Sequence, residues 1–509
     1  MVFGSILFPE GSAGPPPLVA EAPACLSDLN LNQVIEAITA GRDEVDLQPF
    51  FFTPLHNADA IRYRQEVAQD LEEADGVLLD GVRSFAQRMV EMRRARALVE
   101  KLPNRYHRQG WFVEGVRRYG EAVVGLLEAL ERAELRSRGL IAFREYLREY
   151  VRSAGFTSLL QETQALKQAL EQIRYTILIR GSRVEVREYR SETDYSVEVE
   201  ETFARFKQGA VKDYSVPLGV HSGLNHVEAA ILDRVARLYP AQFSALDDYC
   251  TRHRGYLDET IARFDREIQF YVAYQEFTAR IRRAGLAFCY PRISATGREI
   301  WARDAFDLAL AAKRASVVPN DFHLSDPERI LVISGPNQGG KTTFARMFGQ
   351  LHYLASLGCA VPGRAAQLAL FDRLFTHFEK EEDIKNLRGK LQDDLVRIRA
   401  ILDQATPESI IILNEIFTST TLSDGIFLSR RILERILELD ALCVWVTFIE
   451  ELATASEKTV SMVSTVAPEN PALRTYKFVR RPPDGLAYAI AIAQKHGLTY
   501  AQLRERLAA

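Results

Sequence analysis

A short run of residues, Gly335 to Thr342, has the types and spacing needed to hold a chain of phosphates. Its sequence GPNQGGKT matches the pattern G-x-x-x-x-G-K-[ST]. Glycines let backbone N–H groups turn inward around phosphate oxygens, and a helix that starts there adds a favourable dipole. In such a loop Lys341 contacts the β- and γ-phosphates of ATP, and the Thr342 hydroxyl binds Mg2+. The loop therefore predicts a site for ATP and Mg2+.

The segments on either side of this loop fit that prediction. Ile330 to Ile333 is an apolar run that predicts a buried strand, and an amphipathic helix pattern begins at Phe344. A strand before the loop and a helix after it are the structural context that the pattern requires. The predicted phosphate-binding residues are Gly335, Pro336, Asn337, Gln338, Gly339, Gly340, Lys341, Thr342 and Thr343.

A second motif begins with the apolar run Ile410 to Leu413, which predicts another buried strand. Asn414 and Glu415 follow it. A carboxylate at Glu415 can orient an attacking water, so Lys341 and Glu415 are the candidate catalytic residues. The amide oxygen of Asn414 can accept a hydrogen bond from a metal-bound water but carries no negative charge. We expect Thr342 and Asn414 to hold Mg2+ weakly, and hydrolysis to be slow; a degenerate site without hydrolysis is the alternative.

Two regions of different composition surround these motifs. From about Leu31 to Arg174, Leu, Ala, Glu and Arg recur at helical spacing, and a long helix is expected after Pro240. Between them, Tyr175 to Glu188 predicts a β-hairpin around Gly181. From about residue 286 strands and helices alternate, which is typical of an α/β layer with a parallel sheet. The predicted domains are an N-terminal arm over 1–30, a helical domain over 31–285 and an ATPase domain over 286–509.

The bulk composition is that of a soluble globular protein. The 509 residues are 47% hydrophobic and 26% charged, with a net charge of −4, so a nucleic-acid site has to be a local patch. The five cysteines form no C-x-x-C pair, which favours a reducing compartment and no zinc site. The N-terminus lacks the basic residues of a signal peptide, and no apolar run is long enough to span a membrane. We expect a cytoplasmic protein without a membrane partner.

Several segments together resemble the MutS family of DNA mismatch repair proteins. GPNQGGKTT is similar to the family's phosphate loop, and LNEIFTSTTLSDG and TFIEEL align with its later motifs. The resemblance implies an α/β P-loop ATPase domain of the ABC type with a parallel-rich sheet, preceded by a mostly α-helical lever and clamp domain. It also implies a homodimer through the ATPase domains, and adenine contact by Val317 to Asn320, which adds Val318 to the predicted site. The family's mismatch-recognition domains have no counterpart here.

The chain departs from the MutS pattern at its catalytic motifs. Asn414 stands where the family has Asp, Phe448 replaces a His that senses the γ-phosphate, and RGKLQDD replaces a Ser-Thr signature loop. In a dimer, Arg388 or Lys390 of that loop could meet the partner's γ-phosphate, and a solvated charged loop is the equal alternative.

DNA binding is the remaining expectation from sequence. Basic residues outnumber acidic ones ten to three between Arg83 and Arg118, and Tyr106, His107 and Trp111 lie among them. Such a stretch could follow a phosphate backbone, although a solvated helix face is the simpler interpretation. The segments GVHSGLNH and CTRHRGY are weaker candidates. Two functions stay open: an ATP-switched clamp on DNA, or a MutS-shaped, ATP-sensing interaction protein that binds no DNA.

Overall fold

The computed structural model describes residues 3–9, 17–73, 76–181, 183–192, 224–294, 299–314, 316–379, 389–483, 498–500, 503, 504 and 506. Its contacts divide the chain into two compact units. One, here called the helical unit, comprises Met1–Phe3, Leu71–Leu135 and Leu140–Asp265. The other, the sheet unit, comprises Gly4–Asp70, Arg136–Gly139 and Arg266–Ala509. The domain bounds predicted from the sequence stay predictions.

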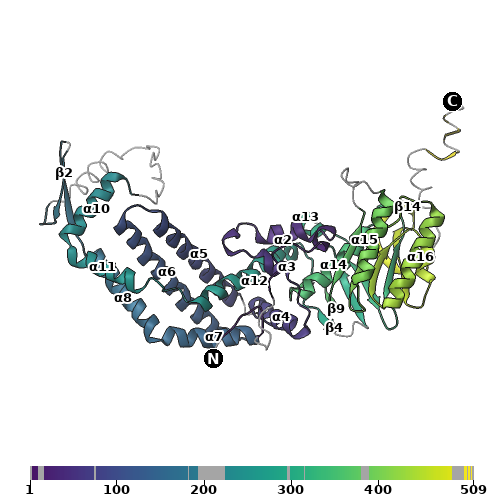
Figure 1. The fold of residues 1–509 in the computed structure, drawn as a ribbon, viewed down its shortest axis with the longest axis horizontal. Helices are drawn as coiled ribbons and strands as arrows, with labels where there is room; N and C mark the ends of the chain where they lie inside the picture. The colour runs from purple at the N-terminus through teal and green to yellow at the C-terminus, as the bar shows by residue number, and fades with distance from the viewer. Residues whose placement is uncertain are drawn as a thin grey trace. The chain divides into compact units, whose positions relative to one another are not determined.

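Helix α5 (Val77–Lys101) and helix α6 (Arg105–Arg132) pack side by side as the centre of the helical unit (Figure 1). A short turn joins them, and the Asn104 side chain accepts a hydrogen bond from the His107 N–H and so caps α6. The remaining helices that lie wholly or largely in this unit are α7 (Arg138–Arg152), α8 (Ala154–Glu171), α10 (His226–Leu238) and α11 (Pro240–Arg252). The helical composition predicted for this region is therefore present in its described residues.

The predicted hairpin is present, whereas the predicted long helix after Pro240 is broken. Strands β1 (Tyr175–Arg180) and β2 (Arg183–Glu188) pair antiparallel. After α11 the chain leaves the helical conformation and resumes it in α12 (Glu259–Arg283). The break has a local cause, because Gly255 weakens a helix and the Asp258 carboxylate accepts from the Ile261 N–H, which starts a new one.

A six-stranded sheet is the centre of the sheet unit, in the order β10-β11-β12-β7-β13-β14. Every neighbouring pair is parallel except β13 with β14. The strands are β7 (Ile330–Ser334), β10 (Leu374–Phe378), β11 (Ile410–Asn414), β12 (Leu442–Val446), β13 (Thr459–Ala467) and β14 (Asn470–Arg480). β7, β11 and β12 are buried along their whole length, which explains their continuous apolar sequences.

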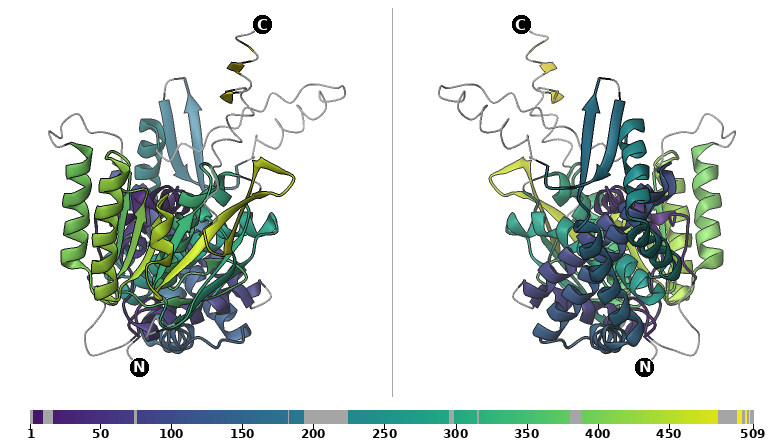
Figure 2. Two further views of the ribbon diagram at one scale, coloured as in Figure 1. Left: turned by 90° about the vertical axis from the view of Figure 1, so that its right-hand side faces the viewer. Right: turned by 90° about the vertical axis from the view of Figure 1, so that its left-hand side faces the viewer.

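Helices cover both faces of this sheet. Alternate side chains such as Val332, Leu413 and Trp445 share one apolar core with helices α15 (Lys390–Gln404) and α16 (Leu422–Leu439), which stand together along one face in Figure 2. Helix α14 (Lys341–Ser356) contacts β11 and β12. A Cβ on its Gly349 would lie 2.7 Å from Ile412, so glycine lets the helix approach the sheet closely. This is a mixed α/β fold with a parallel-rich sheet, as the sequence predicts.

Smaller elements complete the sheet unit. A four-stranded sheet has the order β4-β9-β5-β6, from β4 (Arg292–Ser294), β5 (Ile300–Ala305), β6 (Asn320–Leu324) and β9 (Ala365–Ala369). β3 (Phe288–Cys289) pairs with β8 (Val361–Pro362). The helices are α1 (Cys25–Asp28), α2 (Leu31–Thr39), α3 (Gln48–Phe52), α4 (Ala58–Glu73) and α13 (Leu308–Lys313), and the 3-10 turns are η1 (Asp43–Val45) and η2 (Glu450–Thr454).

From Gly4 onward, the described part of the N-terminal arm is anchored in the sheet unit. Ile6 and Leu7 are fully buried, and the Glu267 carboxylate accepts from the Ile6 N–H at 2.9 Å. Helix α1 lies against β10, where the Thr376 hydroxyl donates to Asp28 at 2.7 Å. The linker GSAGPPP lies almost wholly outside the described residues. In the described part of the chain, no helix has both the length and the apolar character to cross a membrane.

Candidate nucleotide-binding site

The loop from Gly335 to Gly340 connects β7 to α14 and has an unusual backbone. Gly335 has φ 122°, Gln338 has φ 60° and Gly340 has φ 89°. Positive φ favours glycine, which occupies two of these three positions. The loop also packs tightly on β13. A Cβ at Gly339 would lie 2.6 Å from Oγ of Ser464, whose hydroxyl donates to the Gly339 carbonyl at 2.7 Å. The glycines are therefore required by both conformation and space.

Lys341 begins α14 and points its ammonium back into the loop. Its Nζ donates to the carbonyl oxygens of Gly335 at 3.2 Å and Pro336 at 3.3 Å, and to Oδ1 of Asn337 at 3.3 Å. It also lies 3.5 Å from Oε1 of Glu415. The side chain is only 7% exposed. A buried cation surrounded by oxygen acceptors is well placed to bind an anion that enters the loop.

Thr342 and the end of β11 meet beside Lys341. The Thr342 hydroxyl donates to Oδ1 of Asn414 at 3.0 Å. Asn414 is buried as the last residue of β11. The backbone turns at Glu415, which has φ 51° and whose N–H donates to the Val446 carbonyl at 2.9 Å. Because the carboxyl ends of parallel strands meet at one edge of a sheet, two motifs that are distant in sequence converge here.

These residues open into a pocket of about 700 Å³. Asn337, Gln338, Lys341, Glu415 and Val318 line it, as predicted, together with Gly340, Thr342 and Thr343. Gly335, Pro336 and Gly339 form the loop behind it, and Asn414 lies behind Thr342. Most of the residues predicted from the two motifs are thus brought to one place, and the lining combines oxygen and nitrogen groups with apolar side chains.

The apolar part of the lining includes residues that the two motifs do not predict. Tyr476 and Phe478 of β14 line the pocket together with Phe306, Leu310 and Met347. Asn320 holds this wall, since its Oδ1 accepts from the Phe478 N–H at 2.8 Å. Tyr476 and Phe478 lie in β14 (Asn470–Arg480), where a short alternation of apolar and polar residues predicts a strand but not its contact with the loop.

Asp307 is a further lining residue without a sequence signal. Burial raises the pKa of its carboxyl above the usual range, while hydrogen bonds from Gln350 and the Leu310 N–H oppose that rise. The carboxylate caps the start of α13. Its position is therefore explained by the fold, and it needs no ligand.

Phe448 and Lys390 stand where the chain departs from the MutS pattern, and neither lines the pocket. Phe448 is 52% exposed and is not among the residues that line the pocket. The ammonium of Lys390 pairs with Glu379, which also accepts from the Thr418 hydroxyl at 3.4 Å. Lys390 is therefore engaged within its own chain. Arg388 lies outside the described residues.

Residues 331–504 match the family described as MutS domain V. The match starts within β7 and includes the loop, Lys341, Thr342, Asn414 and Glu415. Over this domain the chain is similar to the MutS family. Most motif residues of the pocket therefore lie in a segment similar to a known domain. The geometry of the pocket alone does not identify that domain.

Curated proteins similar to this chain are also named as MutS proteins. The chain is 33% identical over 176 residues to the "DNA mismatch repair protein MutS 2" of Halobacterium salinarum, a match that covers 34% of this chain and 19% of that protein. It is 35% identical over 145 residues to the "DNA mismatch repair protein MutS" of Rickettsia bellii, covering 28% of this chain and 16% of that protein. The matched part thus spans about a fifth of these relatives.

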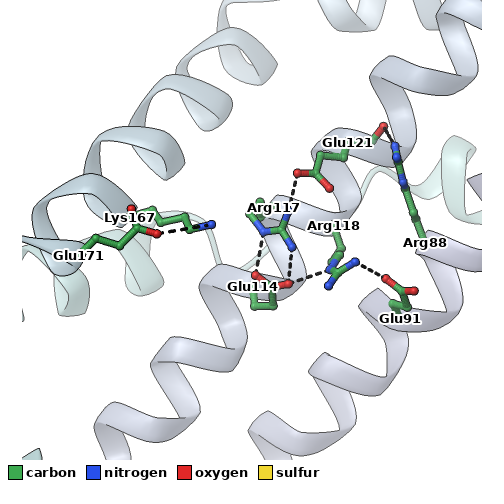
Figure 3. A network of polar contacts seen from close by, with 8 residues as sticks. All are labelled: Arg88, Glu91, Glu114, Arg117, Arg118, Glu121, Lys167 and Glu171. Atoms are coloured by element: carbon green, nitrogen blue, oxygen red, sulfur yellow. Dashed lines mark hydrogen bonds and ion pairs between the residues drawn. The ribbon is translucent and has the colours of Figure 1, made fainter. Parts of the chain in front are cut away.

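The basic stretch of the helical unit has a different character in space than in sequence. Arg117 donates to Glu114 at 2.7 Å and also pairs with Glu121, while Arg118 bridges Glu114 and Glu91 (Figure 3). Hydrogen bonds from Arg117 lower the pKa of the Glu114 carboxyl, which burial opposes. These arginines are largely neutralised by carboxylates of the same two helices.

Other members of the stretch are also engaged. Arg88 donates to the Glu121 carbonyl at 2.9 Å, and Arg93 pairs with Asp265. Tyr106 packs edge-on against Phe243, with ring centroids 4.8 Å apart, and so does not present an open face. The stretch is therefore no continuous basic track. GVHSGLNH falls mostly outside the described residues, whereas CTRHRGY, Cys250 to Tyr256, is described.

Proposed function

We propose that the chain binds ATP with Mg2+ in the pocket beside Gly335–Thr342. The observation that carries this proposal is the meeting of Lys341, Thr342, Asn414 and Glu415 at one edge of the sheet, from two motifs about seventy residues apart. Lys341 would bind the β- and γ-phosphates, and the apolar part of the lining, which includes Val318 and Tyr476, would contact the adenine. The pocket volume of about 700 Å³ is within the range of nucleotide-sized ligands.

The donor set fits Mg2+. The Thr342 hydroxyl and the Asn414 amide oxygen are 3.0 Å apart, and both are oxygen ligands of the kind that Mg2+ uses together with water and phosphate oxygens. The ion would neutralise charge that develops on the phosphates. Because neither protein ligand is anionic, the affinity for Mg2+ should be low.

We further propose slow hydrolysis, with Glu415 orienting water. Glu415 is one-third exposed, so water reaches its carboxylate, and Lys341 holds that carboxylate beside the loop. The exposed Phe448 cannot relay a proton or donate a hydrogen bond, which favours a low rate over a fast one.

The proposed role is an ATP-switched, dimeric clamp on DNA that acts in the cytoplasm. Its support is the match to MutS domain V and the similarity to relatives named as DNA mismatch repair proteins. Exposed apolar side chains on the same domain, such as Leu422, Phe427 and Phe448, suit contact with a second copy. All five cysteines are free, which suits a reducing compartment.

The alternative is a MutS-shaped, ATP-sensing interaction protein that binds no DNA. The pairing of Arg117 and Arg118 with carboxylates favours it, because paired arginines release few counterions from DNA. A gel shift on duplex, branched and single-stranded DNA at several salt concentrations separates the two functions. Binding that weakens with salt supports the clamp, and no shift on any substrate supports the alternative.

The nucleotide site has its own test. Titration calorimetry with ATP and Mg2+ should show a site in this pocket, and Lys341→Ala should remove most of the affinity of that site. Lys458→Ala is a matched control, because Lys458 pairs with Asp440 away from the pocket. Equal ATP affinity in the parent protein and in Lys341→Ala would overturn the assignment.

A further inference from the structure

The helical unit contains a second pocket, of about 810 Å³. The end of α5, the start of α6 and the residues after α11 enclose it. Trp111, Phe112 and Tyr256 form an aromatic wall, and the arginines of the lining are Arg96, Arg105, Arg108 and Arg254. A concave site of this size with aromatic walls is within the range of small-ligand pockets, and its four arginines add positive charge.

Three of these arginines differ from the paired arginines of Figure 3. Arg105 is held by Asp247. Arg96, Arg108 and Arg254 make no ion pair or side-chain hydrogen bond with any residue that the structure describes. They come from three separate segments but border one pocket. Against them the lining has only two carboxylates, Glu100 and Glu259, so an anion is favoured in the pocket.

Gln109, one of the lining residues, has an acceptor without a partner. Its Oε1 is buried and has no hydrogen-bond donor among the described residues, while its amide nitrogen is fixed by Asp247. A buried acceptor that lacks a donor costs free energy, which a ligand N–H recovers when the side chain turns into the pocket. The pocket therefore suits a ligand that carries both an anion and an N–H group.

The aromatic wall is uncharged and ordered. Phe112 and Tyr256 meet at 89° with centroids 5.6 Å apart. Burial raises the pKa of Tyr256 to about 12, against the opposing charge of Arg96, and raises the pKa of Cys250 to about 11. Both groups stay protonated at neutral pH, so the wall can face a flat ring without charge repulsion.

We propose that this pocket binds a nucleoside phosphate, with the phosphate at Arg96, Arg108 and Arg254 and the base near Trp111 and Gln109. Anion, flat ring and N–H donor occur together in that class of ligand. The source is either a free mononucleotide or one nucleotide of a single strand. The proposal is independent of the ATP site in MutS domain V.

The test uses the full chain and its Lys341→Ala variant, so that binding at the ATP site is recognised separately. Adenosine and guanosine 5′-monophosphate, inorganic phosphate and a five-nucleotide single strand are titrated in turn by calorimetry. We expect at least one monophosphate to bind at one site, equally in both proteins. Arg108→Ala and Arg254→Ala should weaken it about tenfold or more.

Arg94→Ala is the control, because Arg94 is exposed on α5 but does not line the pocket. It should leave the affinity unchanged. A single strand that binds more tightly than the monophosphates, with the same loss in Arg108→Ala, identifies a strand as the source, and the reverse order identifies a free nucleotide. The proposal is overturned if phosphate alone binds as well as the monophosphates, if no nucleotide or strand binds, or if only Lys341→Ala reduces binding.

Discussion

The hydroxyl of Thr342 donates a 3.0 Å hydrogen bond to Oδ1 of Asn414. This contact joins the first turn of α14 to the end of β11, and so joins the phosphate loop to the second motif. It also directs the amide oxygen towards Thr342, the proposed Mg2+ ligand, where an aspartate would present a carboxylate. A site with the same geometry and one negative charge fewer should bind Mg2+ more weakly.

Asn414→Asp tests this account directly. A carboxylate beside Thr342 should lower the Mg2+ concentration for half-maximal ATPase activity about tenfold, which corresponds to about 1.4 kcal/mol. The measurement is ATPase rate against Mg2+ concentration for both proteins. An unchanged or higher requirement would mean that the amide is a working part of a differently built site, with the new carboxylate repelling Glu415.

Glu415→Gln should separate binding from turnover. The substitution keeps the size of the side chain but removes the carboxylate that lies 3.5 Å from Lys341 Nζ. We expect the ATPase rate to fall about a hundredfold, as is usual for loss of a group that orients or deprotonates water, with little change in ATP affinity. Glu438→Gln, in a surface pair with Arg435, should retain the parent rate. Full turnover in Glu415→Gln would move the role to another residue.

Gly339→Ala should damage the phosphate loop through crowding. The added Cβ would lie 2.6 Å from Oγ of Ser464 and 2.9 Å from the Pro336 carbonyl, so the loop has to move. ATP affinity, measured by calorimetry, should fall about tenfold or more. Gly155→Ala meets no atom within 4 Å and serves as the control. Adding Ser464→Gly to Gly339→Ala should restore part of the affinity, and no recovery would show that Ser464 is not the obstacle.

His352 predicts a specific acid sensitivity. Burial lowers its pKa from an ordinary 6.5 to about 4, and a hydrogen bond with the Phe348 carbonyl opposes that shift. The folded state therefore binds a proton later than the unfolded state as pH falls. The contribution of His352 to the free energy of unfolding is fully present above pH 6.5 and is lost as the pH falls toward 4, by at most about 3 kcal/mol. Denaturant unfolding at several pH values should show a smaller decline in His352→Phe, and an equal decline would contradict the assignment.

The sequence was sufficient for the parts of the site that depend on neighbouring residues. Apolar runs such as Ile410–Leu413 predict buried strands, and the glycine pattern before Lys341 predicts the turn into α14. The contacts of Ser464 and Tyr476 could not be predicted, because they depend on β13 and β14 folding back beside a loop more than a hundred residues earlier. The compensation of the Arg117 charge could not be predicted for a similar reason, since Glu121 and Glu114 pair with it only once the helix has formed.

The contact between α1 and β10 has a consequence for how the protein can be handled. β10 is an outer strand of the six-stranded sheet, and its open backbone groups could otherwise pair with a strand of another molecule. The bond from Thr376 to Asp28 places a segment from the N-terminal arm against that outer strand. Shortened versions that begin after residue 30 should therefore aggregate, even though every residue of the nucleotide pocket is kept.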